Sequence, residues 1–135
     1  GDLLICARGK DNRVSIYRGE FKMAAAMSSI VVVRIKPEFI NTIQPGYLLA
    51  YLNSVSAQDW FSKNALGATI IYLDRDTIAS IEVSIPSLED QRCISELMET
   101  GKKEIQNLDK LVQLKQQFLE KTLEKMLTNQ SKKEI

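Results

Sequence analysis

The feature that most constrains the fold is the proline-free stretch that follows Pro86. Ser87 is a favourable N-cap residue, and Glu89 and Asp90 place negative charge on the first turn, where the helix dipole is positive. Because no proline follows Pro86, we predict one long helix over about 88–127, which Gly101 weakens in the middle by roughly 1 kcal/mol relative to alanine. At ~1.5 Å per residue it would extend roughly 60 Å, more than the expected width of the preceding globular part.

One face of this predicted helix carries an apolar stripe whose members recur at alternating steps of three and four residues, interrupted by Lys115 and Thr122. Apolar surface left in water forgoes ~25 cal/mol per Å², so a packing partner is expected. We predict a coiled coil with another helix of the same kind or with a second copy. The predicted helix interface comprises Ile105, Leu108, Leu111, Val112, Phe118, Leu119 and Met126.

The preceding residues show the short β-branched and apolar clusters of a small sheet, at 3–5, 14–17 and 30–35, with turn-rich stretches between them. Residues 70–73 also have the composition of a strand. Ile81, Val83 and Ile85 alternate with polar residues, which predicts a half-buried strand that Pro86 ends.

Two short helices are expected between these strands. The first would place one apolar face toward the core, made of Tyr47, Leu48, Tyr51, Leu52 and Val55. The second would be capped by Ser56, with Asp59 three residues on, and would end near Gly67. Trp60 and Phe61 in this helix could stack on bases, but a core position is the stronger expectation.

These patterns predict an α+β fold, with a small mixed sheet and short helices followed by one long C-terminal α-helix that packs in a coiled coil. We expect a globular domain over 1–86, the long helix over 87–130 and a tail over 131–135. Apolar runs are too short to span a membrane, and Cys6 and Cys93 fit reduced thiols in the cytoplasm.

The residue types present argue against catalysis. The chain contains no histidine, no paired nucleophile and base, and no phosphate-binding glycine motif, so we expect neither an enzyme nor a bound cofactor or metal. Asp74 and Asp76 could hold a cation, but two acids in a polar turn favour a solvated loop. A small-molecule enzyme is the weakest of the functions considered.

Any DNA binding must come from a local patch, because the net charge is only +1. Arginine and lysine pair with phosphates or guanine edges, and asparagine can read adenine. Asp2, Asp11 and Glu20 lie nearby in the sequence, so a solvated hairpin is an equally good interpretation. The candidate DNA-binding residues are Arg8, Lys10, Asn12, Arg13, Tyr17, Arg18 and Lys22.

Three blocks of the chain resemble the DNA specificity subunit of type I restriction and modification enzymes. Gly-Asp-Leu-Leu-Ile at 1–5, with Arg8-Gly9 after it, is similar to a strand and loop in the middle of that family's target recognition domain. Residues 33–37 and 47–54 look like the family's next strand and helix. Residues 67–70 and 81–91 are similar to its closing strand and the start of its long helix, and this last block is the most specific.

The resemblance implies a non-catalytic reader of double-stranded DNA. In that family two recognition domains each read half of a bipartite target, and two long helices pack antiparallel to set the distance between the half-sites. The helices and adjoining surfaces dock methyltransferase subunits, while a separate restriction subunit carries the nuclease. A rod of ~60 Å spans nearly two turns of B-DNA at ~34 Å each, which agrees with a spacer.

Family domains begin with further strands and loops before the Gly-Asp-Leu-Leu segment, so we expect 1–86 to lack the N-terminal portion of a recognition domain. The alternative function is a coiled-coil interaction or scaffold module without DNA binding. It is favoured by the charge balance of residues 88–135, which hold nine basic and nine acidic side chains.

Overall fold

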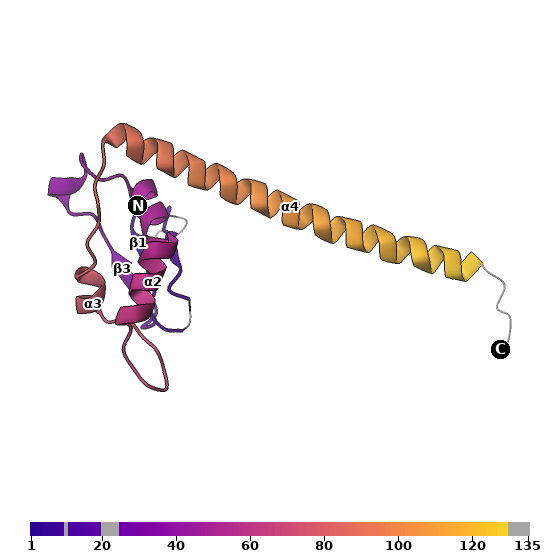
Figure 1. Ribbon diagram of the computed structural model, residues 1–135, viewed down its shortest axis with the longest axis horizontal. Helices are drawn as coiled ribbons and strands as arrows, with labels where there is room; N and C mark the ends of the chain where they lie inside the picture. The colour runs from indigo at the N-terminus through magenta and orange to yellow at the C-terminus, as the bar shows by residue number, and fades with distance from the viewer. Residues whose placement is uncertain (10, 20–24, 130–135) are drawn as a thin grey trace. The chain divides into compact units, whose positions relative to one another are not determined.

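The computed structural model describes residues 1–9, 11–19 and 25–129 (Figure 1). The chain divides into two compact units, Gly1–Leu97 and Met98–Ile135. None of the helices within the described ranges combines the length and apolar character needed to cross a membrane.

The first unit contains a three-stranded sheet formed by β1 (Leu3–Cys6), β2 (Val14–Ile16) and β3 (Ile30–Val33), in the order β2-β1-β3. The three predicted strand clusters are confirmed. Both pairings are antiparallel, so the prediction of a mixed sheet is corrected in this detail. A parallel neighbour would need a long crossover connection, and β1 instead turns back into β2 through a short loop.

Four short helical segments follow the sheet: η1 (Pro37–Phe39), α1 (Pro45–Leu52), α2 (Val55–Asn64) and α3 (Arg75–Ala79). With the sheet and the long helix described below, they confirm the predicted α+β class.

The boundary between the two predicted helices lies earlier than expected. The N-cap of α2 is Ser54, whose hydroxyl accepts the Ala57 N–H at 3.3 Å, not Ser56. Ser54 has the extended backbone that a cap needs, whereas Ser56 already lies inside the helix. Val55 therefore starts α2, is 77% exposed, and does not belong to the apolar face of α1.

Two predicted strands are not strands in the structure. In 70–73, pairing is limited to bridges of Tyr72 with Arg8 and Leu66. Residues 81–85 are also outside any strand. Their backbone carbonyls accept hydrogen bonds from tyrosine hydroxyls instead, Ser84 from Tyr47 at 2.5 Å and Glu82 from Tyr51 at 3.0 Å.

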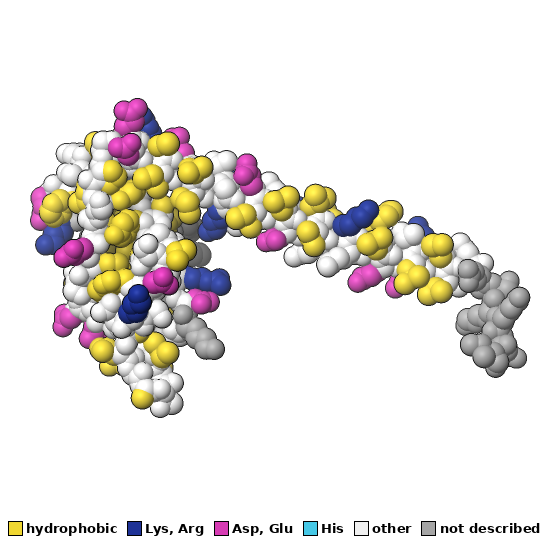
Figure 2. All heavy atoms as spheres, viewed as in Figure 1, with side chains coloured by type: hydrophobic (Ala, Val, Ile, Leu, Met, Phe, Trp, Pro, Cys, Tyr) yellow, Lys and Arg dark blue, Asp and Glu magenta, His cyan; other side chains and the backbone are white. Residues whose placement is uncertain are grey.

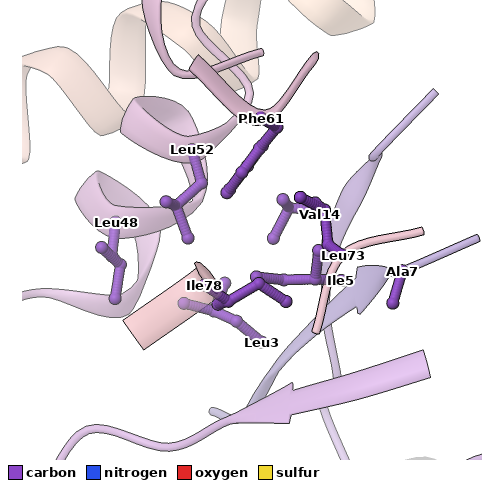
Figure 3. Packing of buried hydrophobic residues seen from close by; sticks show 9 residues of the cluster. All are labelled: Leu3, Ile5, Ala7, Val14, Leu48, Leu52, Phe61, Leu73 and Ile78. Carbon is purple, nitrogen blue, oxygen red and sulfur yellow. The ribbon is translucent and has the colours of Figure 1, made fainter. Parts of the chain in front are cut away.

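The core of the first unit lies between the sheet and the short helices (Figure 3). Alternate residues of β1 point inward, because successive side chains of a strand face opposite sides. Phe61 is fully buried and Trp60 packs beside it with the ring centroids 5.8 Å apart, so both serve the core, as expected. The buried cluster comprises Leu3, Ile5, Ala7, Val14, Leu48, Leu52, Phe61, Leu73 and Ile78.

The long helix is confirmed. α4 is continuous over Leu88–Asn129, 42 residues. The Ser87 hydroxyl accepts the Asp90 N–H at 3.1 Å and also binds the Asp90 carboxylate, which gives the helix the predicted N-cap.

The first turn of α4 is held on the first unit by Gln91, which is fully buried. Its side-chain oxygen accepts the Gln44 N–H, and its amide nitrogen donates to the carbonyls of Thr42 and Pro86, all at 2.9 Å. Each polar atom of a buried glutamine needs a hydrogen-bond partner. The bonds to Gln44 and Thr42 therefore fix the first turn of α4 relative to the segment 42–44 that precedes α1.

A second contact brings α1 and α4 close together. A Cβ built at Gly46 would lie 3.2 Å from the Ser95 hydroxyl oxygen, so a glycine allows the close approach.

Candidate nucleic-acid interface

The segment between β1 and β2 carries the first of the candidate DNA-binding residues, and hydrogen bonds hold its residue Asn12 in place. Asn12 is only 4% exposed, and its side-chain amide donates to the Cys6 carbonyl at 2.9 Å. Gln58 of α2 donates in turn to the Asn12 carbonyl at 3.0 Å. The Asn12 side chain therefore shapes the loop in this arrangement and does not face solvent.

Two candidate cations are exposed on this loop. Arg8 follows β1 and Arg13 precedes β2, so both lie at the same end of the β1–β2 hairpin. Arg13 forms an ion pair with Asp11 at 3.5 Å, with both side chains largely exposed. An exposed pair of this kind contributes little to stability.

Tyr17 and Arg18 lie beyond the opposite end of β2. The Tyr17 N–H donates to the Asp2 carbonyl, and the amino group of Gly1 donates to the Tyr17 carbonyl at 2.9 Å. A strand rises by ~3.3 Å per residue, so Arg13 and Tyr17 are separated by roughly 13 Å along the sheet. The candidate residues thus form two groups, and Lys10 and Lys22 lie outside the described residues.

An ion pair also marks the end of the sheet near Tyr17. Arg34 Nε donates to a carboxylate oxygen of Asp2 at 2.7 Å, and a guanidinium Nη bonds the other oxygen. The hydrogen bond from Arg34 holds the pKa of Asp2 below its ordinary value and raises that of Arg34. Asp2 therefore neutralises a neighbouring cation at this end.

A further loop, residues 66–72, pairs with Arg8, and the sequence does not predict a DNA contact in it. The Gly9 N–H donates to the Ile71 carbonyl at 3.2 Å, and the Leu73 N–H to the Ala7 carbonyl at 2.8 Å. The backbone of Tyr72 bridges Arg8 on one side and Leu66 on the other. Gly67 was the only sequence signal of a special turn here.

Of the two acids considered as cation ligands, Asp74 and Asp76, Asp74 caps a helix. The Asp74 carboxylate accepts the Thr77 N–H at 2.7 Å as the N-cap of α3, and hydrogen bonds from Thr77 lower the pKa of Asp74. Across the described ranges no three potential ligand side chains are grouped as a metal would require.

The predicted helix interface on α4 is exposed. All seven of its side chains are at least 55% exposed, and Figure 2 shows hydrophobic side chains at intervals along the helix. Lys115, which interrupts the stripe, places its ammonium 5.4 Å from the centre of the Phe118 ring. A row of exposed apolar side chains is typical of an interaction surface, and the predicted interface stays a prediction.

Comparison with known families shows that the type I restriction modification DNA specificity domain matches residues 1–116, which include the sheet, the short helices and more than half of α4. The chain belongs to this family. The resemblance seen in the sequence is thereby confirmed, and the chain carries a domain of DNA specificity, not of catalysis. A search of curated proteins finds no match.

Proposed function

We propose that this specificity-domain protein reads one half of a bipartite DNA target through residues 1–86 and sets the distance to the other half through the helix over 87–130. The match to the DNA specificity family over residues 1–116 carries this proposal. The protein acts in the cytoplasm, with methyltransferase subunits docked on the helix and adjoining surfaces and with a restriction subunit joining through them. Residues 131–135, expected from the sequence to be a tail, lie outside the described residues.

DNA is contacted at the hairpin end that holds Arg8 and Arg13. Both side chains are exposed on a loop that Asn12 and Gln58 hold in shape, so binding need not order the backbone. Tyr17 and Arg18 are a separate candidate contact, because β2 lies between them and the Arg8 and Arg13 end.

Replacing Arg8 and Arg13 together by alanine is expected to weaken binding to random-sequence duplexes and to reduce the salt slope of log K by about two, since each phosphate contact contributes about one. The measurement is a titration of the complex with methyltransferase subunits at several salt concentrations. Arg18→Ala is the matched control from the other end of β2 and should change the slope less. An unchanged slope in the double variant would favour the scaffold function.

The apolar stripe of α4 packs against a second long helix, as in an antiparallel coiled coil. The stripe repeats every seven residues, which is the period of such pairing. The stripe is exposed along most of the second unit, so it can pack against the apolar stripe of a second helix.

The double variant Leu108→Asp and Val112→Asp is expected to dissociate this pairing, because it buries two carboxylates in an apolar seam. Sedimentation should show the associated species of the unmodified chain replaced by the single chain. Gln106→Asp with Gln117→Asp adds the same charge on the outer positions of the heptad and should leave association intact. Equal effects of the two double variants would count against the stripe as the interface.

A further inference from the structure

The loop of residues 66–72 closes tightly on itself. The Leu66 N–H donates to the Tyr72 carbonyl at 2.8 Å, and the Tyr72 N–H donates back to the Leu66 carbonyl at 2.9 Å. Gly67 has φ +99°, which side-chain-bearing residues rarely adopt, and a Cβ there would overlap the carbonyl oxygen of Ile70. The loop therefore has one defined shape before any partner binds.

The tip of this loop is apolar, uncharged and exposed. Ile70 is 66% exposed and Ile71 is 45% exposed, and Thr69 supplies the hydroxyl between them and Gly67. Figure 1 shows the loop extending from the end of α2 before the chain returns to α3, and Figure 2 shows hydrophobic side chains at that extremity of the unit. Exposing apolar side chains to water is unfavourable, so we infer that this tip is a contact surface.

The loop lies next to the hairpin end that carries candidate DNA-binding residues. Backbone bonds join it to Arg8 and Gly9, so it shares an edge with the hairpin end that holds the exposed cations. An uncharged tip on a loop whose base pairs with Arg8 matches a DNA groove, where cations bind phosphates and aliphatic side chains contact thymine methyl groups or base steps.

We propose that the 66–72 loop is a second DNA-reading element, in which Ile70 contacts base edges while Arg8, paired with Tyr72 at the base of the loop, binds a backbone phosphate. This inference rests on the proposed DNA-reading function and assigns part of the sequence preference to Ile70. Because the loop is already shaped, little conformational freedom is lost on binding.

The test compares Ile70→Ser with Ile40→Ser, a control whose isoleucine follows η1 and is similarly exposed, at 63%. Each variant, assembled with methyltransferase subunits, selects duplexes from a random-sequence pool, and the bound fraction is sequenced. In Ile70→Ser the preference for one base over the others should fall about tenfold at one or two adjacent base pairs. It should keep the preference elsewhere, and Ile40→Ser should keep it throughout.

The remaining outcomes separate this inference from the function on which it rests. If Ile70→Ser selects the same sequences as the unmodified chain, the proposed role of the loop is overturned and the proposed function still stands. Loss of assembly with the methyltransferase subunits in sedimentation would show that the loop is a protein contact, which also overturns it. If the unmodified chain selects no sequence at all, the proposed function itself fails, and this inference with it.

Discussion

Replacing Gln91 by leucine is expected to lower the free energy of unfolding of the Gly1–Leu97 unit by about 2–4 kcal/mol. Leucine has a similar size but cannot accept the Gln44 N–H or donate to the carbonyls of Thr42 and Pro86. A buried polar group without a partner costs about 1–3 kcal/mol, and part of this is recovered where water reaches a carbonyl. The effect is large because one side chain satisfies three backbone groups.

Urea unfolding followed by the fluorescence of Trp60 measures this change, because Trp60 is the only tryptophan of the chain and packs against the core of that unit. Gln106→Leu is the matched control, since Gln106 is an exposed glutamine of the same helix. The control should shift the free energy by less than about 0.5 kcal/mol. Equal shifts in the two variants would show that the Gln91 bonds do not hold the first turn of α4.

Elements set by local chemistry were predictable from the sequence. The Ser87 cap and the absence of proline define α4, and β-branched clusters define the three strands. The segment 81–85 was mistaken for a strand because alternating burial is common to any extended segment that lies on a core. The hydrogen-bond partners of such a segment depend on the tertiary structure. Here the hydroxyls of Tyr47 and Tyr51 in α1 take the place of a neighbouring strand.

The candidate interface was less predictable, because closeness in sequence differs from closeness in space. Arg13 and Arg18 are five residues apart, yet β2 places them at opposite ends of the sheet. Arg8 and Tyr72 are far apart in sequence, yet their backbones pair. An asparagine amide can form hydrogen bonds with adenine, which made Asn12 a candidate. Its side chain is buried and donates to a backbone carbonyl of β1, which a sequence pattern does not reveal.

Lengthening α4 by one heptad is expected to move the two half-sites of the DNA target apart without changing the bases of either. Duplicating residues 105–111 repeats the apolar stripe, and seven residues return the helix face to within about 20° of its original direction. The insertion adds ~10 Å at ~1.5 Å per residue, which corresponds to roughly three base pairs at ~3.4 Å each.

An insertion of five residues at the same position is the matched control. It adds ~7.5 Å, about 3 Å less than the heptad, and turns the stripe by about 140°, so the helix pairing should fail. Loss of assembly with five residues and retention with seven would show that the register of the stripe, and not length alone, is needed.

The most direct test of the reader-and-spacer account is a map of the DNA sites methylated by the complete complex, with and without the duplicated heptad. The same two half-sites are expected in both maps, separated by roughly three more base pairs in the longer variant. An unchanged separation, with the complex still assembled and active, would contradict the reader-and-spacer account.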